Sequence, residues 1–226
     1  MLKGRNPHAA LSLIHELDLY NEIFSPLAED APTLPLQDMK MAADVVRYPL
    51  LGYTPSHPHI SKLLTTNNEK YLAWLIAAMS PWRAQPVFPA DKKKNTPAAG
   101  TAIRGSLKAP NSITGTIAKA FANYEVIQNM VVDLKNWGRG KAGLEMRALG
   151  ADWKNQVGAC LMFELVDLKK KKDASDYEEG GKGVMDKYEG FLEVITAKGL
   201  EEAFNFKSLL TVLPPPSFFP QYRSSD

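Results

Sequence analysis

The amino-acid sequence predicts an all-α protein, an irregular helical body with no significant sheet. Apolar residues recur at helical spacing through most of the chain. No segment combines strict alternation with β-branched residues and hairpin turns. Hydrophobic residues make up 45% of the 226 residues, which is enough to bury a core in one large domain or two small helical ones. The chain has no internal repeat of roughly 30 to 45 residues, so a regular solenoid is not expected.

Residues 1–83 are expected to form the N-terminal part of this helical body. Asn6 is a suitable N-cap and Pro7 fits the first helical position. The apolar face that this first helix is expected to bury consists of Ala10, Leu13, Ile14 and Leu17. Further helices are expected over residues 36–51, with a bend or an end near Pro49, and over residues 57–66 and 68–80.

Residues 84–100 contain three prolines and a lysine triplet, and we expect them to form a loop or linker. Residues 101–168 should then form the C-terminal part of the body. Its first apolar stripe is expected to end at Trp137-Gly138, with the glycine as a C-terminal cap. Two more helices should follow, a short one over 141–149 and a long one whose N-cap is Asp152.

The last two segments are predicted to differ from the body. Residues 169–183 are charged, contain glycine and lack periodicity, which indicates a mobile charged loop. Residues 184–226 would be a truncated tail that begins with one more helix. Its Pro214-Pro215-Pro216 run cannot continue a helix and should be extended.

The charges are segregated along the chain. Residues 1–90 carry a net charge of −1, residues 91–172 carry +8, and residues 173–226 carry −5. A basic middle favours a polyanionic partner such as a nucleic acid. The alternative is a solvated surface, because seven of the positive charges lie in the runs 92–94 and 169–172. No stretch approaches the roughly 18 apolar residues that a membrane span needs, so no membrane partner is expected.

The sequence contains no coherent set of catalytic residues. No two aspartates are separated by a single residue, so the Asp-x-Asp pair that holds Mg²⁺ in nucleotidyl transfer is absent. The four histidines have no metal-binding spacing, and residues 138–143 lack the ending of a phosphate-binding loop. The single cysteine, Cys160, lies in an apolar run and is expected to be a buried structural thiol. This use of cysteine fits a reducing intracellular compartment.

Four stretches carry a family resemblance. The chain opens with Met1-Leu2-Lys3-Gly4-Arg5-Asn6-Pro7 and continues with an Ala-Leu, a Leu-Ile and a Tyr-x-x-Ile-Phe pattern up to Phe24. The other three run from Tyr71 to Trp82, from Ile103 to Asn111 and from Leu149 to Trp153. In this order they resemble the body of eukaryotic class II CCA-adding tRNA nucleotidyltransferases, over roughly residues 1–210.

The resemblance implies a role in tRNA processing, the addition of the 3′-terminal CCA to tRNA from CTP and ATP with Mg²⁺. In that family the catalytic carboxylates lie in the head and neck, so no catalytic or metal-binding residue and no cofactor is expected in this chain. The helical body and tail hold the tRNA. The chain would therefore be a fragment, the tRNA-binding portion of the enzyme, inactive without the head. The surface that normally meets the neck would be open to dimerisation.

We expect the RNA contacts to come from Lys and Arg on helices, because their side chains are better ordered than those of loop lysines. One predicted group is Arg104, Lys108 and Lys119, and the other is Lys135, Arg139, Lys141, Arg147 and Lys154. Phosphate contacts of this kind position an RNA without reading its sequence. A helical protein-interaction module with no nucleic-acid role is the alternative function.

Overall fold

The computed structural model describes residues 1–25, 32–85, 96–171 and 174–201. The described part contains only helices and the segments that join them, with no strand, which confirms the predicted all-α class. The first half contains α1 (Pro7–Glu16), α2 (Tyr20–Phe24), α3 (Gln37–Val45), the π-type turn η1 (Val46–Leu50), α4 (Pro58–Ser61), α5 (Asn67–Met79) and the 3₁₀ turn η2 (Ser80–Ala84). The second half contains α6 (Ala98–Leu107), α7 (Asn111–Ala122), α8 (Tyr124–Asp133), the 3₁₀ turn η4 (Leu134–Asn136), α9 (Arg139–Leu149), α10 (Trp153–Lys171) and α11 (Ala174–Ala197).

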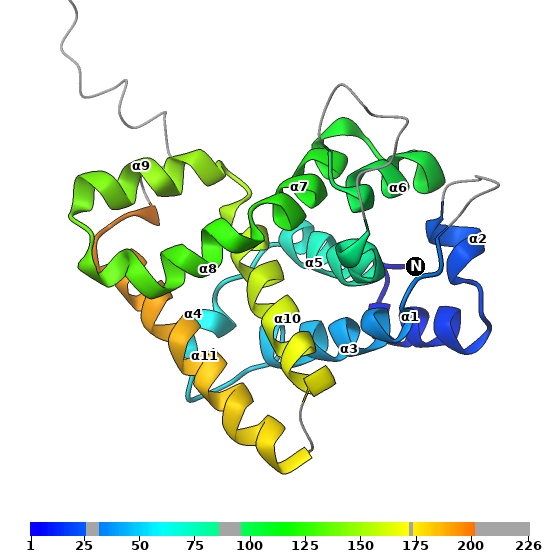
Figure 1. Ribbon diagram of the computed structural model, residues 1–226, viewed down its shortest axis with the longest axis horizontal. Helices are drawn as coiled ribbons and strands as arrows, with labels where there is room; N and C mark the ends of the chain where they lie inside the picture. The colour runs from blue at the N-terminus through cyan, green and yellow to red at the C-terminus, as the bar shows by residue number, and fades with distance from the viewer. Residues whose placement is uncertain (26–31, 86–95, 172–173, 202–226) are drawn as a thin grey trace, which may run out of the picture.

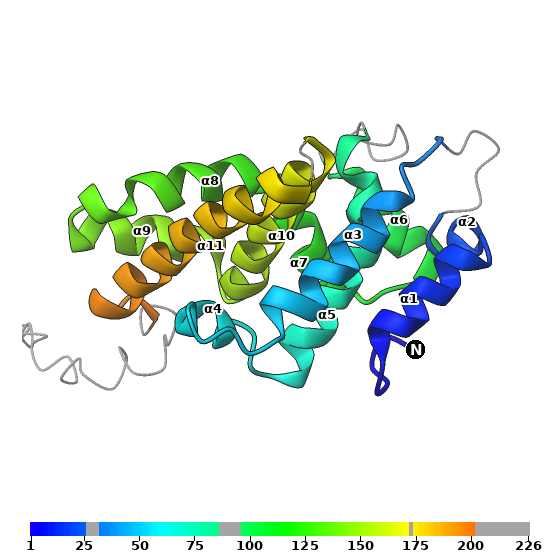
Figure 2. The ribbon, with the colours of Figure 1, turned by 90° about the horizontal axis from the view of Figure 1, so that it is seen from below.

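The helices form an elongated body with α10 at its centre (Figure 1). At one end lie α9, the end of α8 and the C-terminal end of α11. At the other end lie α1 and α2 (Figure 2). Twelve residues of α10 are buried, from Trp153 to Val166, so this helix is covered on nearly all sides. Such a helix lacks a polar face over most of its length because it packs against neighbours all round.

Polar side chains tie the central helix to its neighbours. Arg83 in η2 forms a bidentate ion pair with Asp167 of α10, with N–O distances of 2.8 and 2.6 Å. The Arg83 guanidinium also lies over the ring of Tyr124, 4.4 Å from its centroid. One turn earlier on the same side of α10, Glu164 accepts a hydrogen bond from Tyr188 of α11 at 2.7 Å. These contacts fix the rotation of α10 between the two halves of the chain.

The start of α1 follows the sequence prediction, whereas its buried face follows it only at Ile14 and, in part, at Ala10. Asn6 Oδ1 accepts the Ala9 amide at 3.1 Å, and Pro7 begins the helix. The buried residues are Leu11 and Ile14, while Leu13 and Leu17 are 51% and 56% exposed. The helix is therefore rotated relative to the predicted face, because α3 and α5 pack against its Leu11 side.

The predicted mobile loop over residues 169–183 is wrong for the part that the structure describes. α10 continues to Lys171, and α11 begins at Ala174. Lys169 and Lys170 pair with carboxylates of α3, Asp44 at 3.6 Å and Asp38 at 2.5 Å. The segment lacks apolar periodicity because its charged residues cover the surface of two long helices.

Two smaller predictions are also corrected. The helix expected over 57–66 is only α4, Pro58–Ser61, since Thr66 already serves as the N-cap of α5. Gly138 does not end a helix: α8 ends at Asp133, and Gly138 precedes the first residue of α9. Most of the predicted linker 84–100 and most of the predicted tail 184–226 lie outside the described residues. None of the described helices is long and apolar enough to span a bilayer.

Candidate nucleic-acid interface

The eight predicted RNA-binding residues lie on the surface, and the structure separates them into three places. Seven are exposed and Lys154 is half-buried. None of the eight forms an ion pair with another residue that the structure describes. Lys169, Lys170 and Lys187, by contrast, are each held by a carboxylate. The candidate cations are therefore available to neutralise an external anion, a property that they share with other exposed lysines such as Lys40 and Lys62.

The first place is the end of the molecule formed by α8, α9 and α11 (Figure 1). We define the tip cluster as Lys135, Trp137, Arg139, Lys141 and Lys198. The Lys141 ammonium lies 4.2 Å from the centroid of the Trp137 ring. Lys198 Nζ donates to the carbonyls of Leu134 and Trp137, at 3.1 and 2.5 Å. An Arg139 guanidinium nitrogen lies 3.7 Å from the position that a Cβ on Gly199 would take.

These contacts give the tip cluster a fixed shape. The Lys198 bonds join the end of α11 to the turn between α8 and α9. The ring of Trp137 supports the Lys141 side chain, which lowers the entropy that Lys141 would lose on binding. The first turn of α9 contains no acidic residue. The unpaired amides of that turn therefore add to the positive potential of Arg139 and Lys141.

The second place is the turn between α9 and α10, around Gly150. Gly150 has a φ of +82°. Lys119 Nζ lies 3.4 Å from the position that its Cβ would take. Arg147 is in the last turn of α9, and Lys154 is in the first turn of α10. Thr116 donates to Asp152 at 2.7 Å and so fastens the turn to α7. Asp152 is thereby engaged with α7, although the sequence indicated a capping role.

The third place is the C-terminal end of α6, which carries Arg104 and Lys108. The sequence grouped these two residues with Lys119. Lys108 precedes α7, whereas Lys119 is in its last turn, so about 12 Å of helix axis separates them. Lys108 is the C-cap of α6 and has a φ of 51°, a left-handed conformation that is uncommon outside glycine. The predicted first group is therefore divided between two places.

Sequence reasoning missed two further cations. Lys198 lies in the acidic segment 173–226, so the charge segregation gave no reason to select it. Lys3 lies over the ring of Tyr71, 4.6 Å from its centroid, beside a groove of about 610 Å³. That groove is lined by the chain start and the first turns of α5, including Lys70 and Trp74. Only the contact between distant segments identifies these two lysines.

Three of the four histidines, all of which lie in the described part, contact carboxylates. His8 pairs with Asp44, His57 with Asp186, and His59 with Glu189, at 2.7 to 2.9 Å. Cys160 is buried, as predicted, and burial raises the pKa of its thiol to about 12. No group of three or more His, Cys, Asp or Glu among the described residues could hold a metal ion.

Comparison with curated proteins gives relatives along most of the chain. The chain is 27% identical over 216 residues to tRNA nucleotidyltransferase cca1 of Schizosaccharomyces pombe, which covers 93% of this chain and 41% of that protein. It is 22% identical to tRNA nucleotidyltransferase cca2 of the same organism, covering 93% of this chain and 40% of that protein. Nucleotidyltransferase lcsQ of Purpureocillium lilacinum is 29% identical over 170 residues, 70% of this chain and 28% of that protein.

This chain is related to the tRNA nucleotidyltransferases. The similarity confirms the relation to CCA-adding enzymes that the four sequence stretches predicted. The chain spans about two fifths of the length of cca1 and cca2. No family model matches the chain, and no solved structure matches it.

Proposed function

We propose that this chain is the tRNA-binding helical portion of a CCA-adding tRNA nucleotidyltransferase. The observation that carries the proposal is the similarity over 93% of the chain to two tRNA nucleotidyltransferases. The unpaired cations on helices support it, because they form fixed positive surfaces of the kind that contact phosphates. The tip cluster, the Gly150 turn and the end of α6 would each contact the RNA backbone.

The role of these residues in this proposal is positional. Lysine and arginine contacts to phosphates release counterions and set the register of the RNA, while its A-form shape provides recognition. Among the described residues, no group of three or more His, Cys, Asp or Glu could hold a metal ion. Transfer of the nucleotide from CTP or ATP with Mg²⁺ would accordingly belong to a catalytic part other than these residues. The chain alone should not incorporate labelled CTP into tRNA.

The test is a titration of the purified chain with tRNA that lacks its CCA end, at several salt concentrations. An unstructured RNA of equal length is the control ligand. We expect the chain to bind the tRNA more tightly than the control RNA. We also expect its affinity to fall steeply with salt. The slope of log affinity against log salt concentration, called the salt slope below, should be about one unit per phosphate contact. Equal and salt-insensitive binding of both RNAs would contradict the proposal and favour the protein-interaction alternative.

A charge-reversal pair tests the residues themselves. The variant Lys135→Glu/Lys141→Glu changes two exposed cations of the tip cluster. The matched control Lys40→Glu/Lys62→Glu changes two exposed lysines, on α3 and just after α4, outside the three places. We expect the first variant to lose about two units of salt slope and the control to keep the wild-type slope. Equal losses of salt slope in the two variants would mean that RNA binding depends on the net charge of the chain and not on the position of the lysines.

A further inference from the structure

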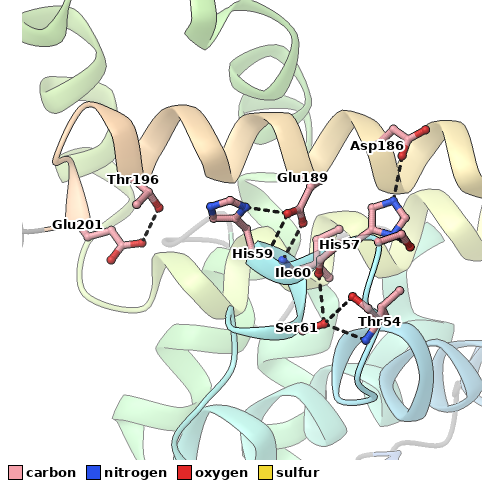
Figure 3. Close-up of polar contacts among 10 residues, drawn as sticks. Thr54, His57, His59, Ile60, Ser61, Asp186, Glu189, Thr196 and Glu201 are labelled. Atoms are coloured by element: carbon pink, nitrogen blue, oxygen red, sulfur yellow. Dashed lines mark hydrogen bonds and ion pairs between the residues drawn. The ribbon is translucent and has the colours of Figure 1, made fainter.

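Two histidines on either side of Pro58 meet two carboxylates on one face of α11. His57 Nε2 lies 2.9 Å from Asp186 Oδ1, and His59 Nδ1 lies 2.7 Å from Glu189 Oε1 (Figure 3). Asp186 and Glu189 are three residues apart, so they project from the same side of the helix. About 130 residues of sequence separate the partners. We call these four residues the α4–α11 clamp.

Glu189 does more than pair with a histidine. Its two oxygens accept the backbone amides of His59 and Ile60, at 2.9 and 3.0 Å (Figure 3). These amides belong to α4, which has only four residues and receives no side-chain cap from its own N-cap residue, His57. A carboxylate on α11 therefore caps α4. The Glu189 side chain is 15% exposed, which shields these hydrogen bonds from water.

The clamp partners have few competitors nearby. The second nitrogen of His57 is 2.9 Å from Ser56 Oγ, and the His57 side chain is 7% exposed. Lys187, next to Asp186, is held by Glu164 at 2.5 Å. Lys169, which lines the same cavity as His57, pairs with Asp44 at 3.6 Å. Lys187 and Lys169 are thus engaged elsewhere, whereas Lys182, which lines the same cavity, forms no ion pair with the described residues. The hydrogen-bond partners of the clamp carboxylates among the described residues are the histidines and the α4 amides.

The clamp tethers the helix that carries one part of the tip cluster. α11 packs on α10, where Tyr188 donates to Glu164, and Phe191 and Ile195 of α11 are buried as well. α4 also packs against α11 at the clamp (Figure 2). About two turns beyond Glu189, the helix ends near Lys198, which fastens the carbonyls of Leu134 and Trp137. A shift of α11 would therefore move the lysine that shapes the tip cluster.

We infer that His57, His59, Asp186 and Glu189 are positioning residues that set the geometry of the tip cluster through α11. The inference rests on the proposed RNA contact for its function, but its structural half is independent. Without the clamp, the C-terminal end of α11 should move relative to α3. The tip cluster should then lose phosphate contacts, while the Gly150 turn and the end of α6 keep theirs.

The test compares Glu189→Gln with Glu193→Gln, an exposed glutamate of the same helix. In Glu189→Gln, one carboxylate oxygen that now accepts a hydrogen bond is replaced by an NH₂ group. That group would face the backbone amides of α4, which are also donors. Spin labels on Lys40→Cys and Ala197→Cys, both exposed, report the distance between α3 and the end of α11. We expect a broader distance distribution for Glu189→Gln and Asp186→Asn than for wild type and the control. Identical distributions would overturn the inference.

RNA binding provides the second readout. Glu189→Gln should lower the salt slope for tRNA by about two units, and adding Lys135→Glu/Lys141→Glu should then lower it little further. A general loss of stability would weaken binding without this non-additivity. Additive effects would overturn the link between the clamp and the tip cluster. If wild type binds no RNA, the proposed function fails, and the label distances still decide whether the clamp positions α11.

Discussion

Lys108 combines a candidate contact role with an unfavourable backbone conformation. It is the C-cap of α6 with φ and ψ of 51° and 37°, and the side chain is exposed. Glycine is the residue that fits this position best, since a Cβ in the left-handed region meets the backbone. A lysine here gives up stability, and strained positions of this kind often have functional roles. The conformation is thus a second reason, besides charge, to select Lys108.

Replacing Lys108 by glycine should separate stability from binding. We expect Lys108→Gly to raise the free energy of unfolding by about 0.5–1 kcal/mol, because the left-handed strain is removed. The same variant should bind tRNA more weakly, with about one unit less salt slope. Urea denaturation and the salt titration measure the two effects. Lys108→Ala keeps the strain and removes the charge, so it should show the binding loss alone. Unchanged binding by both variants would remove Lys108 from the interface.

The surface positions of the candidate contact residues could be predicted only in part from the sequence. Charge and helical position identified seven exposed cations and the half-buried Lys154, which form no ion pair with described residues. Their grouping was wrong for Lys119, since the turn at Gly150 brings it to the start of α10. Lys198 was missed because its place beside Trp137 depends on a contact 61 residues away in sequence. Sequence spacing carries no information about such contacts.

At the scale of helices, two glutamates stabilise the starts of α5 and α4. Glu69 Oε2 accepts the amides of Thr65 and Thr66, both at 2.8 Å, and completes a capping box with Thr66. Burial raises the pKa of Glu69, but these hydrogen bonds outweigh it and hold the pKa below its ordinary value. The pKa of Glu189 is likewise lowered, because the His59 and Ile60 amides outweigh its burial.

These lowered pKa values predict a specific acid sensitivity. The unfolded chain binds a proton on each glutamate at about pH 4.3, whereas the folded chain does so only at lower pH. The stabilisation is therefore complete above that value and is lost as the pH falls through the folded pKa. Glu69→Gln should be less stable than wild type at neutral pH. Its free energy of unfolding should decrease less steeply between about pH 5 and pH 3.

Urea denaturation over a pH series measures the effect, with Glu16→Gln as the control. Glu16 is an exposed glutamate of α1 and accepts no side-chain hydrogen bond from the described residues. Equal slopes for Glu69→Gln and wild type would show that the capping hydrogen bonds do not favour the ionised carboxylate.

Helices with an apolar stripe were predictable, and helices covered by charges were not. Residues 113–131 and 153–168 repeat apolar residues at helical spacing, and the structure has α7, α8 and α10 there. The predicted loop at 169–183 failed since Lys169, Lys170 and their neighbours lie on the surface of helices held by ion pairs to α3. Partners such as His57 and Asp186 are too far apart in sequence for local patterns to show.

Across the whole molecule, burial is uneven from the centre to the tip. α10 buries twelve residues, from Trp153 to Val166, whereas α9 buries only Ala142, Met146 and Leu149. Leu144 of α9 is 67% exposed. Segments with few buried apolar contacts open locally at lower free energy than the core. The end of the molecule that carries the tip cluster is therefore expected to be its least stable part.

Hydrogen exchange under native conditions tests this gradient and its link to RNA. We expect the amides of α9 to exchange faster than those of α5 and α10, because α9 can open without exposing the core. Bound tRNA should slow exchange in α9 and at the end of α11, and should change α5 little, since a ligand that binds only the closed tip shifts the local equilibrium. The variant Lys135→Glu/Lys141→Glu should lose that protection, while exchange in its α10 stays at the wild-type rate.

Uniform exchange along α5, α9 and α10 would show that the molecule opens as one unit. Protection by tRNA that is confined to α5 would place the RNA at the groove beside Lys3.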